Sequence, residues 1–420
     1  MEQKKRRVIL VGVNVDKNED FEYSMLELKN LAIACDFEVV DKLVQNAEKI
    51  HNGHYLGKGK LEELSNIMKE KDIEIAVFYD ELSPAQIKNI EKYLESTIMD
   101  RTNLILDIFA SRAQTKEAKM QVEIAQLQYM LPHLTGSYTN LSRQGGTSGT
   151  AANKGAGETK LELDKRKMLS KISKLKKELE KITGEREVQR NLRESRNVPV
   201  VSLVGYTNSG KSTIMNVLVD VYGGNEEKKV LEKNMLFATL ETSVRQINLE
   251  RSRNFLLTDT VGFVDKLPHK LVKAFRSTLE EIKMADVILH VVDYSNVDYE
   301  KQIEVTNQTL EEIGVGGIPV IYVYNKCDLK GLRQPRLNPD SVFISAKEKM
   351  GIRELITIIK QEIFKDYVSC KMLIPFDKGN ISAYLIANSQ IISNKYINEG
   401  TLLELECSKS DYEKYKEYLV

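Results

Sequence analysis

The sequence has little cysteine, little proline, no net charge and no long hydrophobic run, and each of these excludes a class of protein. No stretch approaches the roughly 18 uninterrupted apolar residues that a membrane helix needs. The basic start and the apolar run from Val8 to Val13 resemble a signal peptide, but no small-residue cleavage site follows. The cysteines form no CxxC pair, so we expect neither a zinc knuckle nor a disulfide framework, but the free thiols of a reducing compartment: Cys35, Cys327, Cys370 and Cys407.

What is present suits a folded chain of two to three domains. The 420 residues are 42% hydrophobic and 29% charged, which excludes a disordered or collagen-like protein. The 61 basic and 61 acidic residues balance, but not locally. From Arg112 to Arg196 there are 18 Lys and Arg against 10 Asp and Glu, a balance of +8. One basic segment on an otherwise acidic chain points to an anionic partner for that segment.

The first hundred residues alternate strand-like and helical patterns, which predicts a small, mainly parallel sheet covered by helices. Strand character is expected at 8–15, 37–44 and 73–79, and helices at 25–34, 61–68 and from Ser83-Pro84 to Leu94. The glycines from Gly53 to Gly59 lack the spacing of a nucleotide fingerprint and favour a turn before a helix.

Two amphipathic helices with matching apolar stripes are expected next, as an antiparallel hairpin. The first stripe runs from Met120 to Leu131, where Pro132 is expected to end the helix, and the second from Leu161 to Ile182. The polar connection at 135–159 is long for a loop and contains Arg143 and Lys154. The hairpin is either a solvated spacer or an element whose tip enters a groove of RNA.

A doubly wound nucleotide-binding fold is expected from Val198 onward, with strands at 200–204, 255–258, 287–292, 318–324 and 342–344. From about Lys371 the pattern alternates as in strands, with a last helix near 411–418. The predicted organisation is therefore an α/β N-terminal domain (1–110), a basic helical hairpin (111–196), a P-loop domain (197–367) and a small C-terminal α+β domain (368–420).

The segment GYTNSGKS follows an apolar strand, opens a helix and fits the phosphate loop G-x-x-x-x-G-K-[ST]. Gly205 and Gly210 let the backbone N–H groups turn toward phosphate oxygens, and the helix N-terminus favours the same anion. Lys211 is expected to reach the β- and γ-phosphates, and Ser212 to ligate Mg²⁺. The remaining phosphate-binding residues expected in this loop are Tyr206, Thr207, Asn208, Ser209 and Thr213.

Four later motifs follow one another in the order typical of a guanine-nucleotide domain: FATLETS, DTVG, NKCD and SAK. In DTVG, Asp259 is expected to hold Mg²⁺ and Gly262 to sense the γ-phosphate; in FATLETS, Thr239 is expected to close on both, with Phe237 beside it. Asp328 of NKCD can accept two hydrogen bonds from guanine, which adenine does not offer. The other residues expected around the base are Asn325, Lys326, Ser345, Ala346 and Lys347. We take Lys211, Thr239 and Gly262 as the catalytic set.

Together these motifs resemble the translation-factor class of GTPases, and within it the HflX family. Further stretches carry that resemblance: RTNLILDIFASRAQTKEAKMQVEIAQLQYMLPHL at Arg101–Leu134, RQGG and GETKLELDKR near Arg143 and Gly157, and GKGK at Gly57. It covers essentially the whole chain. The resemblance implies a bacterial cytoplasmic GTPase that binds the large ribosomal subunit and its RNA and splits or rescues stalled ribosomes under stress. It implies no membrane span and no DNA partner; we expect a monomer, and contact with a membrane surface is left open.

Three positions bear on mechanism. Phe263 stands where Ras-like enzymes place a glutamine that orients the attacking water, so a partner is expected to complete the site. Asn208 occupies the position of an asparagine in potassium-activated relatives, and either binds K⁺ or only stabilises the loop. The loop TSGTAANKGAGET (147–159) is longer than the family pattern, which suggests a changed ribosomal contact and, as a hypothesis, an antibiotic-resistance role.

Other functions remain as alternatives. The first is a ribosome-assembly or RNA-modification GTPase of the Obg or MnmE type, against which the N-terminal signature argues. An ATP-driven enzyme conflicts with Asp328, and a nucleotide-independent RNA-binding module conflicts with the intact phosphate loop. The five histidines show no metal-ligand spacing.

Overall fold

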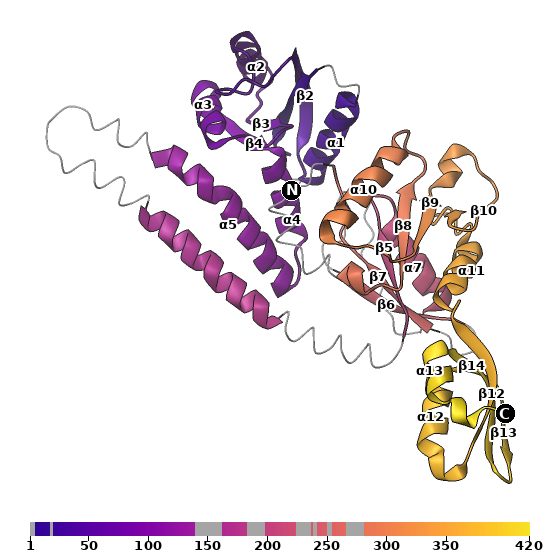
Figure 1. Cartoon of the computed structure of the whole chain (residues 1–420). Helices are drawn as coiled ribbons and strands as arrows, with labels where there is room; N and C mark the ends of the chain where they lie inside the picture. Colours follow the sequence, from indigo (N-terminus) through magenta and orange to yellow (C-terminus); the bar gives the residue numbers. More distant parts are fainter. Residues whose placement is uncertain are drawn as a thin grey trace. The chain divides into compact units, whose positions relative to one another are not determined.

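The computed structural model describes residues 5–16, 20–138, 162–182, 198–223, 237, 242–249, 254–265 and 281–420. The chain divides into two compact units, which are described separately (Figure 1). The first comprises Met1–Thr183 with Met235–Phe237 and Leu267–Phe275, and the second comprises the remainder. Within the described ranges, no helix is both long enough and apolar enough to cross a membrane.

The first unit is built on a four-stranded parallel sheet of order β2-β1-β3-β4. Its central strand β1 is buried from Val8 to Val13, as expected for a strand covered on both faces. The helix α3 begins with a capping box, in which Ser83 and Gln86 bond reciprocally, and Pro84 follows the cap as predicted. The elements are β1 (Arg7–Val15), α1 (Phe21–Ala34), β2 (Glu38–Ala47), α2 (Lys58–Glu70), β3 (Ile75–Phe78), α3 (Pro84–Leu94), β4 (Thr97–Asp100) and α4 (Arg101–Arg112).

Two buried charged groups lie where β4 meets α4. The Asp100 carboxylate caps α4, accepting from the N–H groups of Asn103 (2.8 Å) and Leu82 (3.0 Å). Burial raises the pKa of Asp100 to about 6, although these hydrogen bonds oppose the shift. Next to it, Arg101 pairs with Glu27 at 2.8 Å, and both side chains are buried. This ion pair fastens α4 to α1.

The predicted helical hairpin is present as two antiparallel helices, α5 (Lys116–Tyr138) and the helix of residues 162–182, which lie side by side (Figure 1). Their direction follows from two ion pairs, because Lys116 meets Glu178 at 4.0 Å while Glu123 meets Lys171. The prediction that Pro132 ends the first helix is wrong, since α5 continues to Tyr138. A proline removes one backbone hydrogen bond, and the bonds around it keep the helical path.

The second unit contains the expected doubly wound sheet, of order β10-β11-β9-β8-β5-β7-β6. The pairs within β11-β9-β8-β5-β7 are parallel, and the two edge pairs are antiparallel. Helices α7, α10 and α11 accompany this sheet (Figure 1). The elements are β5 (Val200–Val204), α7 (Lys211–Tyr222), β6 (Ser243–Asn248), β7 (Asn254–Asp259), β8 (Val287–Asp293), α10 (Tyr299–Ile313), β9 (Val320–Asn325), β10 (Arg336–Leu337), β11 (Ser341–Phe343) and α11 (Ile352–Ile363).

The C-terminal residues form a three-stranded antiparallel sheet with its own core. The strands are ordered β12-β14-β13, and helices α12 and α13 pack on one face. Sequence patterning predicted the strands and the last helix but missed α12. The elements are β12 (Tyr367–Ile374), α12 (Gly379–Asn388), β13 (Gln390–Ile397), β14 (Gly400–Ser408) and α13 (Lys409–Lys414). The mixed α/β fold class predicted from the sequence is confirmed.

Candidate functional site

The phosphate loop joins the end of β5 to the start of α7, and its two motif glycines are required by geometry. Gly205 has a φ of +148°, and a Cβ there would lie 2.2 Å from the carbonyl oxygen of Val291. Gly210 has a φ of +98°, and a Cβ there would lie 2.1 Å from Nδ2 of Asn325. Because L side chains fit neither the space nor the backbone conformation, this turn needs glycine at both positions.

Lys211 and Ser212 lie at the start of α7. The buried Nζ of Lys211 donates to the carbonyl oxygens of Gly205 (3.0 Å) and Tyr206 (2.9 Å). Burial lowers the pKa of Lys211 to about 8, and the negative charge of Asp259 opposes that shift. The Ser212 hydroxyl donates to Oδ2 of Asp259 at 2.6 Å. A hydroxyl and a buried carboxylate side by side are the hard oxygen donors that Mg²⁺ prefers.

Asn325, at the end of β9, connects the phosphate loop to the loop after β11. Its Nδ2 donates to the carbonyl of Ser209 at 2.9 Å, and its Oδ1 accepts from the Ala346 N–H at 3.0 Å. Both bonds are buried. Asn325 therefore holds two of the expected nucleotide-binding segments in fixed positions relative to each other.

Lys326 makes a second connection to the loop. Its Nζ donates to the carbonyl of Asn208 at 2.9 Å and pairs with the Asp293 carboxylate at 2.7 Å. The Asn208 side chain is exposed, with its backbone in the left-handed region at a φ of 60°. Asp293 ends β8 and was not predicted from the sequence. Its position at the carboxyl end of a central strand was the available signal.

The residues expected around the base also come together. Asp328 lies half-buried in a short 3-10 helix, and the preceding N–H of Cys327 donates to the carbonyl of Ile344 at 3.2 Å. That bond brings the Asp328 turn beside the Ser345–Lys347 segment. Ser345 and Ala346 are buried, Lys347 is exposed, and the Ser345 Oγ accepts from the N–H of Glu348. Their roles toward guanine stay predictions.

The DTVG segment passes close to the phosphate loop. Asp259 is fully buried at the end of β7. A Cβ at Gly262 would lie 2.7 Å from Cα of Thr207 and 3.1 Å from Nζ of Lys211. The Phe263 ring is 2% exposed, so it presents no polar group and little surface to a water molecule. Gly262 thus lies beside the lysine with which it was predicted to act.

The FATLETS segment is only partly described. Phe237 is buried, and its ring packs edge-on against Phe109 with the centroids 4.7 Å apart. It groups with the first unit rather than with the phosphate-loop residues. Its predicted contact with GTP therefore stays a prediction. Thr239 lies outside the described residues, as do Arg143 and Lys154 of the hairpin tip.

His290, on β8, lies near Lys211 of the phosphate loop, and this position was not predicted from the sequence. Its ring is 1% exposed. Burial first, and the nearby charge of Lys211 second, lower the pKa of His290 to about 4, so the imidazole is neutral near pH 7. The one signal in the sequence was a histidine inside the otherwise apolar strand VILHVVD.

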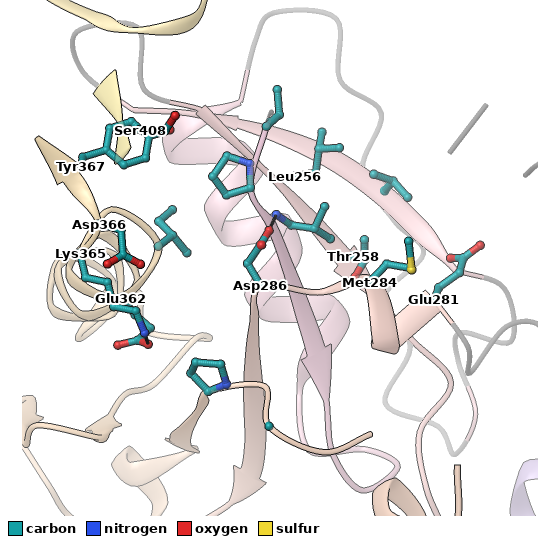
Figure 2. Close-up of a pocket in the computed structure, with 17 residues that line it drawn as sticks. Leu256, Thr258, Glu281, Met284, Asp286, Glu362, Lys365, Asp366, Tyr367 and Ser408 are labelled. Atoms are coloured by element: carbon teal, nitrogen blue, oxygen red, sulfur yellow. Dashed lines mark hydrogen bonds and ion pairs between the residues drawn. The ribbon is translucent and has the colours of Figure 1, made fainter. Parts of the chain in front are cut away.

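A hollow of about 680 Å³ lies at the other end of the same strands (Figure 2). Its lining includes Val200 at the start of β5, Asp286 just before β8, and Tyr367 at the start of β12. The phosphate loop follows the carboxyl end of β5, where open α/β sheets bind their ligands. The hollow is therefore separate from the nucleotide site.

Three family models match the chain. They are described as GTP-binding GTPase N-terminal (residues 22–110), GTP-binding GTPase Middle Region (residues 112–193) and 50S ribosome-binding GTPase (residues 200–326). Among solved structures, the fold is similar to a GTP-binding protein from the archaeon Sulfolobus solfataricus in complex with GDP. That protein is 24% identical with a TM-score of 0.44, over 86% of this chain and 99% of the other.

Curated relatives match over nearly the whole length. The GTPase HflX of Caldanaerobacter subterraneus subsp. tengcongensis is 42% identical over 416 residues, which are 99% of this chain and 94% of the relative. The GTPase HflX of Escherichia coli is 34% identical over 406 residues, 95% of this chain and 92% of the relative. The chain therefore belongs to the HflX family of GTPases, which binds and hydrolyses GTP.

Proposed function

We propose that this HflX GTPase docks on the large ribosomal subunit and its RNA through the hairpin of α5 and the helix of residues 162–182, and that the subunit stimulates hydrolysis of GTP. In this proposal the protein acts as a monomer in the bacterial cytoplasm and splits or rescues stalled ribosomes under stress. The observation that carries it is the exposed basic surface of the helix of residues 162–182. The family model that matches residues 200–326 is described as a 50S ribosome-binding GTPase, and this description supports the large subunit as the partner.

The helix of residues 162–182 combines one packed face with many exposed cations. Ile172 is buried, while Lys171 reaches Glu123 of α5. The basic side chains of this helix are exposed, and they outnumber the acidic ones. The basic residues are Lys165, Arg166, Lys167, Lys171, Lys174, Lys176, Lys177 and Lys181, and the acidic residues are Glu162, Asp164, Glu178 and Glu180. A cationic surface of this kind binds phosphate backbones by releasing their counterions.

The nucleotide site supports a GTPase that needs a partner. Lys211 would hold the β- and γ-phosphates, and Asp328 would select guanine. Ser212 and Asp259, with Thr239, would hold Mg²⁺, which neutralises charge on the phosphate oxygens. The buried Phe263 ring cannot orient the attacking water, so the ribosomal subunit would supply that group.

The exposed side chain of Asn208 supports a second, smaller proposal, that K⁺ binds beside the phosphate loop. A cation there would add positive charge near the bond that breaks. Replacing K⁺ with Na⁺ at equal ionic strength should then slow subunit-stimulated turnover. An Asn208→Ser variant should lose that difference, and equal rates in both salts for the unchanged protein would refute K⁺ binding.

Pelleting of purified large subunits with a non-hydrolysable GTP analogue tests the docking surface. We expect the triple variant Lys174→Gln, Lys177→Gln, Lys181→Gln to bind more weakly, and its plot of log affinity against log salt to be shallower by about 2–3. The control variant Lys29→Gln, Lys69→Gln, Lys92→Gln removes the same charge from exposed positions of α1, α2 and α3. Equal affinities and equal salt slopes for both variants would refute the proposal.

A further inference from the structure

The segment after Asp259 is hydrogen-bonded directly onto the phosphate loop. The Thr207 N–H donates to the carbonyl of Phe263 at 2.7 Å, and the Phe263 N–H donates to the carbonyl of Gly205 at 3.1 Å. Together they form a parallel bridge between Tyr206 and Phe263. The structure thus shows two short backbone stretches joined as in a sheet, beside the position expected for the phosphates.

One side chain reinforces this bridge. The Tyr206 hydroxyl accepts from the N–H of Asp265 at 2.7 Å, and the tyrosine is 4% exposed. The side chains of Phe263 and Val264, which precede Asp265, are also buried. We call these three hydrogen bonds the loop latch. They run from the Thr207 N–H to the Phe263 carbonyl, from the Phe263 N–H to the Gly205 carbonyl, and from the Asp265 N–H to the Tyr206 hydroxyl.

The loop latch holds Gly262 close to the phosphate loop. On the side that a Cβ would occupy, Gly262 is so close to Thr207 and Lys211 that a methyl group would lie 2.7 Å from a backbone atom and 3.1 Å from Nζ. A phosphoryl group bonded to both the Lys211 ammonium and the Gly262 N–H has to fit between these two groups. If the γ-phosphate lies between Lys211 and the Gly262 N–H, Gly262 must move away when GTP binds. GDP lacks this group and requires no such movement.

We propose that the Tyr206 hydroxyl holds the Phe263–Asp265 segment on the phosphate loop until the third phosphate opens the latch, so that Tyr206 sets the preference of the protein for GDP over GTP. This inference rests on the proposed roles of Lys211 and Gly262 in the site. Movement of Gly262 displaces the adjoining Phe263, whose N–H and carbonyl both bond to the loop. Part of the binding energy of GTP is therefore used to break the latch, whereas GDP binds with the latch closed.

The test is the affinity of a Tyr206→Phe variant for GDP and for a non-hydrolysable GTP analogue. Phenylalanine keeps the buried ring and removes only the hydroxyl that bonds to Asp265. We expect the affinity for the GTP analogue, divided by the affinity for GDP, to rise by roughly 2- to 12-fold, the range that one net hydrogen bond contributes. Tyr384→Phe is the matched control, because its hydroxyl bonds to Asp411 in the C-terminal sheet domain.

Hydrogen exchange at the Asp265 amide gives a second measurement that a merely structural role would not move. The amide should be protected in the nucleotide-free and GDP states, and should exchange faster with the GTP analogue or in Tyr206→Phe. If the variant changes neither the affinity ratio nor this exchange, the latch is refuted while the nucleotide site stands. If the unchanged protein binds neither nucleotide, the site fails and the latch fails with it.

Discussion

The side chain of Asn325 offers a sharp test of how the site is held together. Replacing it with aspartate exchanges one NH₂ group for an oxygen and keeps the shape. The Ala346 N–H keeps its acceptor. The carbonyl of Ser209 loses its donor and instead faces a carboxylate oxygen at about the same place, 2.9 Å away.

The size of the effect follows from burial. A buried group that loses its hydrogen-bond partner costs about 1–3 kcal/mol, and more when a charge is involved. Because Ser209 belongs to the phosphate loop, the cost falls on the loop conformation that binds phosphate. We expect the dissociation constant for GDP to rise by roughly 5- to 150-fold, the range to which that energy corresponds.

Titration with fluorescent GDP measures this change, and thermal unfolding reports any general loss of stability. The control is Asn338→Asp, at an exposed asparagine whose Nδ2 donates to the Ser341 hydroxyl at 2.9 Å. We expect it to leave GDP affinity unchanged. If Asn325→Asp binds GDP as tightly as the unchanged protein, the connection between the two loops does not support nucleotide binding.

Three further predictions concern buried charges. Burial raises the pKa of Asp100 to about 6, so Asp100 contributes most to the free energy of unfolding below about pH 4, and this contribution is lost as the pH rises through 6. The loss amounts to about 3 kcal/mol, and urea unfolding of Asp100→Asn at several pH values should no longer show it. Arg101→Met removes the cation that pairs with the buried Glu27 carboxylate and should cost about 3–5 kcal/mol, while Lys60→Met at an exposed pair should cost about 0–1 kcal/mol; equal losses would contradict the buried pair. Since phosphate favours the charged form of Lys211, whose pKa is about 8 in the free protein, GDP affinity should fall up to about tenfold per unit above pH 8, and a constant affinity to pH 9 would contradict this.

The sequence predicted most of the framework because local signals and the fold agree. The strand before Gly205, the helix after it and the order of the later motifs all indicate one arrangement. The cap at Ser83 was predicted for the same reason, since a capping residue acts on its own helix. Motifs at the carboxyl ends of parallel strands come together, and this accounts for the placement of Asn325 beside Ser209.

What the sequence did not predict depends on contacts between distant residues. The Tyr206 hydroxyl accepts a hydrogen bond from an amide 59 positions away, and the pKa of His290 is lowered first by burial and second by a lysine from another element. Helix α12 was missed because Gly379, Asn380 and Ser382 are weak helix formers, and packing on the C-terminal sheet decides its conformation. Pro132 failed as a helix end because propensity is weak evidence against a long helix packed on a partner.

GTP turnover in potassium buffer, with and without purified large ribosomal subunits, tests whether the ribosome completes the catalytic site. We expect a low rate for the protein alone, because Phe263 offers no group to orient water, and a strong rise when subunits are added. The Lys174, Lys177 and Lys181 triple variant should need more subunits for the same rise. GTP binding with no stimulation by large subunits would refute a catalytic site completed by the ribosome and indicate a different RNA partner for the basic hairpin.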